Sequence, residues 1–270
     1  MNLKNKTIII TGGGNGMGRE LVLNLLKRGN NVIALDINEA ALQETVQLAA
    51  DRKEALATLI VDISREESFD GLADKAIALF GSVDAVICNA GIIQPFKKVY
   101  ELDAAVIQKV FDINFFGTIR LIRAFLPHLF TRPEAHIVNI SSMGGFMPFP
   151  GQAVYGASKA AVKILSESLI SELAATQVRV TVVFPGAMST NIAANSGLGQ
   201  MISAEQGDTS KKILSPTVAA EMIIKGVEKN KNRIFVGSDS KMLNLLYRLS
   251  PNFACKFIYK QMKSEFGEHF

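Results

Sequence analysis

Three polar side chains in the second half of the chain have types and a spacing that suit acid–base chemistry. Ser142 follows the apolar run HIVNIS, Tyr155 lies thirteen positions later, and Lys159 is four positions beyond Tyr155. Residues i and i+4 share a helix face, so Tyr155 and Lys159 are expected to project into the same cleft. A phenol is a poor base at neutral pH, and a nearby ammonium stabilises its anion. The YxxxK spacing alone also fits an ordinary exposed helix, so this interpretation depends on the rest of the chain.

A glycine-rich segment near the start of the chain is the second feature. TGGGNGMGRE, residues 11–20, follows the apolar run TIII. Glycines between a strand and a helix usually bind phosphate, because backbone N–H groups can approach an anion at the positive end of the helix. The segment does not match the Walker motif, because Arg19 and Glu20 occupy the positions of its Lys and Ser/Thr. It does not match GxGxxG either, because Met17 or Arg19 occupies the position of the last glycine. The pattern that fits is TGxxxGxG, from Thr11 to Gly18.

Asp36 ends the next strand-like run, twenty positions after Gly16. An acidic residue at this place can accept hydrogen bonds from an adenosine ribose. The alternative is that Asp36 caps the helix predicted to follow it. The glycine loop before it favours the ribose contact.

Strand-like and helical patterns alternate along the chain and would position these residues. The apolar strand runs are 7–11, 31–36, 56–62, 83–89, 136–141, 178–184 and 233–237. The helical patterns are 16–29, 38–52, 65–80, a long segment to about 130, 153–176 and 216–229. Apolar strands separated by helices indicate a parallel sheet covered on both faces, with ligands bound beyond the carboxyl ends of the strands. The sequence therefore predicts an α/β, doubly wound, seven-stranded sheet in one domain, residues 1–237, followed by a helical tail, 238–270.

Composition excludes several classes of protein. The 270 residues are 48% hydrophobic and 20% charged with a net charge of +4, and Lys and Arg are spread along the chain, so no nucleic-acid partner is expected. Cys88 and Cys255 lie far apart and outside any metal-ligand motif, which indicates neither a disulfide framework nor a metal site. The first strand begins within a few residues of Met1, and no apolar run approaches the roughly 18 residues of a membrane span. The expected location is the cytoplasm.

Six motifs, in this order, resemble those of the short-chain dehydrogenases/reductases. They are TGGGNGMG at 11–18, NAG at 89–91, NFFG at 114–117, Ser142 in NISSMGG, YGASK at 155–159 and PGAMST at 185–190. The resemblance covers roughly residues 4–237, and it is the ordered set of motifs that is specific. It implies a Rossmann-type fold, a nicotinamide cofactor, and hydride transfer between a carbonyl and an alcohol without a metal.

The resemblance also implies roles for single residues. Tyr155 would be the general acid/base, Ser142 would hydrogen-bond the substrate oxygen, and Lys159 would lower the Tyr155 pKa and hold the nicotinamide ribose. Asn114 would kink its helix and support a water relay from Lys159 to solvent. Tyr155 and Lys159 would also contact the cofactor, together with Gly12, Asn15, Gly16, Met17, Gly18, Asp36, Ile37, Asp62, Ile63, Asn89, Ala90, Gly91, Pro185, Gly186, Met188 and Thr190.

The choice of cofactor and the alternative function follow from three of these residues. Asp36 would repel the 2′-phosphate of NADP(H), so the predicted cofactor is NAD(H). A non-catalytic dinucleotide-binding regulator is the alternative function. Such a protein would be expected to have lost Tyr155 or Lys159, and both are present.

The substrate is predicted only by class. Residues 143–154 and 92–96 are apolar and would either line a substrate pocket or pack in the core. The first case favours a hydrophobic ketone or secondary alcohol, such as a steroid, a fatty chain or a terpenoid. Residues 191–213 lack periodicity and are predicted to form a mobile lid over the site.

Two further predictions concern partners. The segments 104–130 and 153–176 resemble the helices through which the family associates, and predict a homodimer or homotetramer. In the tail, apolar residues at helical spacing on both sides of Pro251 predict two short amphipathic helices. We favour a flap packed over the substrate mouth or against another subunit. A membrane-surface anchor is the alternative, because basic residues are interspersed with the apolar ones.

Overall fold

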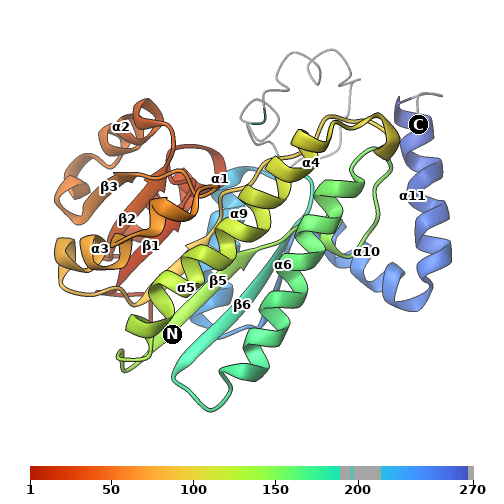
Figure 1. The fold of residues 1–270 in the computed structure, drawn as a ribbon. Coiled ribbons are helices and arrows are strands. Elements are labelled where there is room, and N and C mark those ends of the chain that lie inside the picture. Colours follow the sequence, from red (N-terminus) through yellow and green to blue (C-terminus); the bar gives the residue numbers. More distant parts are fainter. Residues whose placement is uncertain (189–195, 197–213, 267–270) are drawn as a thin grey trace.

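A parallel sheet of seven strands forms the centre of the fold (Figure 1). The computed structural model describes residues 1–188, 196 and 214–266. The strands are β1 (Thr7–Thr11), β2 (Asn31–Asp36), β3 (Leu56–Ile60), β4 (Ala85–Cys88), β5 (Ala135–Ile140), β6 (Val178–Pro185) and β7 (Arg233–Val236). Their order is β3-β2-β1-β4-β5-β6-β7, and every neighbouring pair is parallel. The order reverses between β1 and β4, which is where such sheets bind ligands. The predicted doubly wound sheet is confirmed.

Helices cover both faces of this sheet. One layer consists of α1 (Gly16–Lys27), α2 (Glu39–Leu48) and α9 (Pro216–Glu228), and the other of α3 (Leu72–Phe80), α5 (Gly117–Leu129) and α6 (Ala153–Glu172). In β1, Ile8 and Ile10 pack into the first layer and Ile9 into the second. Successive strand residues point to opposite faces, so a central strand between two helical layers must be apolar throughout.

The long helical segment predicted before residue 130 is interrupted. A π-helical turn, Asp112–Phe116, joins α4 (Ala104–Phe111) to α5, and Asn114 is buried within it. Such a turn inserts an extra residue into the helix, and it is frequent at functional sites. The helical segment thus changes its hydrogen-bond pattern at Asn114, and the kink expected there stays a prediction.

Helices α2, α3 and α6 are shorter than the periodicity predicts, and for the first two a positive φ value accounts for the difference. The pattern at 38–52 ends as an α-helix at Leu48, because Ala50 has a φ of +46° and begins a 3₁₀ turn, Ala50–Ala55. The pattern at 65–80 starts with a 3₁₀ turn and becomes α3 only after Gly71, which has a φ of +64°. Positive φ values end regular helical geometry, and hydrophobic periodicity does not report them.

The tail contains α10 (Ser238–Leu249) and α11 (Pro251–Phe266), at the opposite side of the molecule from α2 and β3 (Figure 1). Buried residues of both helices pack with Met147, which follows β5. They are Leu243, Ala254, Ile258 and Met262. In the part of the chain that the structure describes, no helix has the length and hydropathy needed to cross a bilayer.

Candidate active site

The glycine segment forms a turn between β1 and α1 that requires glycine at two positions, one for space and one for its backbone conformation. A Cβ on Gly18 would overlap the carbonyl oxygen of Gly12, and Gly16 has a φ of +51°. Asn15 caps α1, because its side-chain oxygen accepts a hydrogen bond from the Gly16 N–H at 2.7 Å. The loop thus presents bare backbone at the positive end of a helix, an environment that suits a pyrophosphate.

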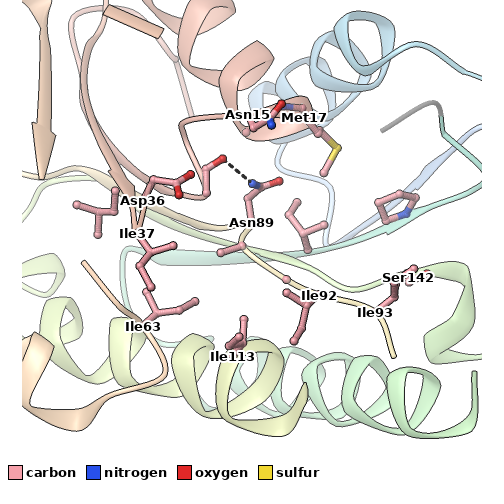
Figure 2. Close-up of a pocket in the computed structure, with 18 of the residues that line it drawn as sticks. Asn15, Met17, Asp36, Ile37, Ile63, Asn89, Ile92, Ile93, Ile113 and Ser142 are labelled. Atoms are coloured by element: carbon pink, nitrogen blue, oxygen red, sulfur yellow. Dashed lines mark hydrogen bonds between the residues drawn. The ribbon is translucent and has the colours of Figure 1, made fainter. Parts of the chain in front are cut away.

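Hydrogen bonds join this loop to the end of β4. The Thr11 hydroxyl accepts hydrogen bonds from the backbone N–H groups of Asn89 and Ala90, at 3.0 and 3.1 Å. The Asn89 side chain donates to the Thr11 carbonyl oxygen at 2.9 Å, and more weakly to that of Gly12 at 3.5 Å. The carboxyl ends of β1 and β4, between which the strand order reverses, are therefore held together as one surface (Figure 2).

Asp36 lies beside the glycine loop at the end of β2. One carboxylate oxygen accepts a hydrogen bond from the Gly14 N–H at 3.0 Å, and the other from the Asn38 N–H at 3.0 Å. The helix α2 is capped by Asn38, whose side chain accepts from Ala41 N–H. Capping of that helix by Asp36, the alternative considered from the sequence, is therefore wrong.

A cavity of about 440 Å³ extends along these strand ends. In Figure 2 it runs from Asp36, Ile37 and Ile63 at one end to Ile93 and Ser142 at the other. Among the predicted site residues, those that line it are Gly12, Asn15, Gly16, Met17, Gly18, Asp36, Ile37, Asp62, Ile63, Asn89, Ala90, Gly91, Ser142, Tyr155, Lys159, Pro185, Gly186 and Met188. Thr190 and all of the predicted lid except Ser196 lie outside the described residues.

Ser142 and Tyr155 meet at the far end of this cavity. Ser142 follows β5, and its hydroxyl oxygen accepts a hydrogen bond from the Gly144 N–H at 3.0 Å. Tyr155 lies in the first turn of α6. Burial raises the pKa of the Tyr155 phenol, and a hydrogen bond with Ser142 acts in the opposite direction and lowers it. Ser142 therefore stabilises the phenolate form of Tyr155 relative to the phenol.

Lys159 lies one helical turn beyond Tyr155 and is only 3% exposed. Its ammonium donates a hydrogen bond to the Ile140 carbonyl oxygen at 3.0 Å. Burial lowers the pKa of Lys159 to about 8, and only a thiolate at the neighbouring Cys88 would act to raise it. Burial likewise raises the pKa of Cys88 to about 12, so its thiol stays protonated and neutral. A buried ammonium with a pKa this low can change charge near neutral pH.

Asn114 lies outside the cavity lining and holds two of its walls together. Its side-chain oxygen accepts a hydrogen bond from the Ile92 N–H at 2.8 Å, and its amide donates to the Ile92 carbonyl oxygen at 2.9 Å. The same amide donates to the Ser158 hydroxyl at 3.0 Å. The π-helical turn thereby connects the loop after β4 to helix α6.

Sequence reasoning missed Asp239, the second residue of α10. One of its carboxylate oxygens accepts a hydrogen bond from the Ala187 N–H at 2.7 Å. A Cβ on Gly186 would overlap this carboxylate, and the Ser240 hydroxyl donates to the Phe184 carbonyl oxygen at 2.8 Å. The tail thus fixes the segment after β6 that lines the cavity. Asp239 matched no motif, and its distance from Ala187 in the sequence left no local signal.

The apolar segments considered for the substrate pocket divide between the two alternatives. Ile92 and Ile93 line the cavity, whereas within the described part of the chain no residue from 143–154 does. Met147 is fully buried, and Phe146 and Phe149 pack with it against the tail helices. Met147 and its neighbours therefore pack as core, and the choice between pocket and core for the rest of 143–154 stays open.

Comparison with known families agrees with this geometry. The profile of the short chain dehydrogenase family matches residues 6–200. The chain is a short-chain dehydrogenase/reductase.

Individual relatives extend the match beyond the profile. SadH of Mycobacterium tuberculosis (strain H37Rv), described as an oxidoreductase, is 35% identical over 254 residues, which are 92% of each chain. The crystal structure of a short-chain dehydrogenase/reductase from Burkholderia phymatum, in complex with NAD, is similar with a TM-score of 0.84 and 25% identity over 93% of this chain and 95% of that one. A short-chain dehydrogenase from Burkholderia cenocepacia in complex with NADP shares the fold, with a TM-score of 0.80 and 23% identity over 96% and 99% of the two chains.

These relatives establish the enzyme class. This short-chain dehydrogenase/reductase is an NAD(P)-dependent oxidoreductase. Because the similar structures hold NAD in one case and NADP in another, the likeness does not choose between the two cofactors.

Proposed function

We propose that the enzyme interconverts a carbonyl and a secondary alcohol with NAD(H), with Tyr155 as the general acid/base. The observation that supports this most strongly is that Ser142 and Asp36 lie at opposite ends of one cavity. Tyr155, which is hydrogen-bonded to Ser142, and Lys159 line the same cavity. When bound, the nicotinamide ring donates or accepts the hydride. The glycine turn, the paired ends of β1 and β4, and the Asp36 carboxylate fit a dinucleotide along this cavity.

Ser142 and Tyr155 supply hydrogen bonds to the reacting oxygen in this proposal. As a carbonyl is reduced, its oxygen gains negative charge, and two hydroxyl donors stabilise that charge. Tyr155 then transfers its proton to this oxygen, and in the reverse direction its phenolate removes the alcohol proton. The Lys159 ammonium, one turn away on α6, favours the phenolate. Asn114 keeps the loop at Ile92 and helix α6 in a fixed relation.

Asp36 supports NAD(H) as the cofactor. Its carboxylate is held in place by two backbone N–H donors, so it cannot readily turn away from a ligand at the end of β2. A 2′-phosphate at this position would meet a like charge, which costs several kcal/mol. The two ribose hydroxyls of NAD(H) would instead donate hydrogen bonds to it.

For the substrate, we propose a hydrophobic ketone or secondary alcohol. Ile92, Ile93 and Ile113 supply apolar surface to the cavity. Steroid, fatty-chain and terpenoid compounds remain the proposed classes. The experiment is a panel of such alcohols and ketones with matched polar ones, monitored by NADH absorbance. The proposal predicts faster turnover of the apolar members, and faster turnover of small polar alcohols would contradict it.

We further propose that the enzyme is a homodimer or homotetramer in the cytoplasm. Large apolar side chains are exposed on the segments expected to associate, at Phe116 and Ile164. Both cysteines, Cys88 and Cys255, are free thiols, as is usual in a reducing compartment. Light scattering at micromolar concentration tests the assembly, and the mass of a monomer would contradict it.

For the tail, the proposal remains a flap beside the site. Its helices pack on residues 143–149, which directly follow Ser142. Asp239 accepts a hydrogen bond from Ala187, which lies between the lining residues Gly186 and Met188. A membrane-surface anchor is the alternative. Truncation after Gly237 should raise the substrate KM or weaken the oligomer. Sedimentation of the full-length protein with anionic vesicles, lost on truncation, would instead establish the anchor.

A further inference from the structure

A buried glutamine lies between the loop after β4 and the start of α6. Gln94 is fully buried, and it is neither a lining residue of the described cavity nor part of a family motif. Its side-chain oxygen accepts hydrogen bonds from the N–H groups of Val154 and Tyr155, at 2.7 and 3.0 Å. Its side-chain amide donates to the Gly151 carbonyl oxygen at 3.0 Å.

These contacts replace an ordinary helix cap. The first N–H groups of any helix lack a partner within the helix, and a polar side chain at the N-cap usually accepts from the second or third of them. In α6 the N-cap residue is Gln152, and its side chain makes no capping hydrogen bond. The Gln152 side chain instead donates to the Gln94 backbone carbonyl at 3.0 Å. Gln94 therefore caps α6 from another part of the chain.

The capped residues include Tyr155 itself. The third residue of α6 carries the phenol, so the Gln94 oxygen bonds to the backbone of the residue whose side chain contacts Ser142. Ile92, two residues before Gln94, donates a backbone hydrogen bond to Asn114, and Asn114 in turn donates one to Ser158 of α6. The loop that supplies Ile92 and Ile93 to the cavity is thus attached to α6 at two points.

We infer that Gln94 is a positioning residue for Tyr155: its side-chain oxygen fixes the first turn of α6 and thereby the place of the phenol relative to Ser142 and the substrate. This inference rests on the proposed role of Tyr155. An apolar residue at position 94 would leave the N–H groups of Val154 and Tyr155 without their acceptor, and the first turn would open to give them new partners. Displacement of a catalytic group by about 1 Å can cost about 100-fold in rate.

Three variants test the inference. Gln94→Met keeps the length of the side chain and removes the acceptor. Gln94→Glu keeps an acceptor oxygen, and because burial favours the protonated carboxyl, its hydroxyl replaces the amide donor to Gly151. The matched control is Ser215→Ala, which removes the cap of α9, where the Ser215 hydroxyl accepts from the Val218 N–H at 3.3 Å. None of these side chains lines the described cavity.

Two readouts are combined for these variants. Hydrogen exchange of a peptide spanning residues 150–160 reports the cap directly, without any substrate. Steady-state kinetics with the best alcohol of the panel, together with NADH titration, separate kcat from cofactor binding. Gln94→Met should accelerate exchange at Val154 and Tyr155 and lower kcat by at least about tenfold, with an NADH Kd within twofold of wild type. Gln94→Glu should keep both kcat and the exchange rates of the Val154 and Tyr155 amides within threefold of wild type. Ser215→Ala should change neither quantity.

Each contrary outcome has a distinct meaning. Faster exchange in Gln94→Met with kcat within threefold of wild type would overturn the positioning role. If Gln94→Met does not fold, Gln94→Glu decides, because a tenfold loss of kcat in a variant that keeps the acceptor would contradict the inference. Failure of the proposed function is detected separately, by a Tyr155→Phe variant that retains activity.

Discussion

The carboxylate of Asp36 accepts a hydrogen bond from the backbone N–H of Gly14 at 3.0 Å, which joins the end of β2 to the glycine loop. This contact places a fixed negative charge at one end of the cavity. We therefore predict that wild-type protein binds NADH at least about tenfold more tightly than NADPH, since tenfold corresponds to about 1.4 kcal/mol and a like-charge contact costs more. Asp36→Ala should reduce the ratio between the Kd values for NADPH and NADH. Tighter binding of NADPH by the wild-type protein, measured by fluorescence titration, would contradict the assignment.

The hydrogen bond between Ser142 and Tyr155 predicts a pH effect. Because this bond lowers the Tyr155 pKa, its removal in Ser142→Ala raises that pKa. Alcohol oxidation needs the phenolate, so the acidic limb of its pH–rate profile should move to higher pH. The rate on the plateau should also fall by about 100-fold or more, as for other lost donors to a developing oxyanion. An unmoved acidic limb would show that Ser142 does not act on Tyr155.

Because Lys159 is buried, we predict that its removal stabilises the folded protein although it abolishes activity. Its pKa is about 8 in the folded protein and about 10.5 in the unfolded chain, so between these values the unfolded state binds more protons. The contribution of Lys159 to the free energy of unfolding therefore rises from pH 8 to about 10.5. At pH 7, Lys159→Met should raise the Tm of the cofactor-free protein by about 2 °C or more, equivalent to about 1 kcal/mol, while abolishing activity. Calorimetry checks this, and a lower Tm at pH 7 would contradict it.

Asp239 predicts that the tail controls cofactor binding. Without its carboxylate, the Ala187 N–H loses its acceptor and the segment from Gly186 to Met188 is less fixed. Asp239→Ala should therefore raise the KM for NAD⁺ several-fold, and Asp239→Asn, which keeps an acceptor oxygen, should recover most of the loss. Lys241→Ala, at an exposed position of the same helix, is the control. An equal effect of all three changes would indicate general disturbance of α10.

Elements with strong local signals can be predicted from the sequence. The apolar runs match β1, β2, β5 and β6 within a residue or two, because a buried parallel strand must be apolar on both faces. The glycine loop and the spacing of Tyr155 and Lys159 are also local patterns. Together with the other family motifs, they identify most of the residues that line the cavity.

Contacts between distant segments could not be predicted. Gln94 belongs to an apolar segment expected at the substrate pocket, yet its side chain caps a helix about sixty positions away. Asp239 lies 52 positions from its partner Ala187. A polar side chain carries no sequence pattern that names such a partner, since only the fold brings the two together. The end of α2 before Ala50 escapes prediction for a related reason, because φ values leave no trace in hydrophobic periodicity.

The central claim is that Tyr155 transfers the proton, and a single substitution tests it most directly. Tyr155→Phe keeps the ring in the first turn of α6 and removes only the hydroxyl. Steady-state turnover of the best panel substrate with NAD(H) should fall by at least about 100-fold, the usual loss for a general acid/base, while NADH binding stays within twofold. Tyr100→Phe, at a phenol that is 80% exposed, should leave turnover unchanged. Turnover near the wild-type rate in Tyr155→Phe, with NADH binding intact, would contradict the account.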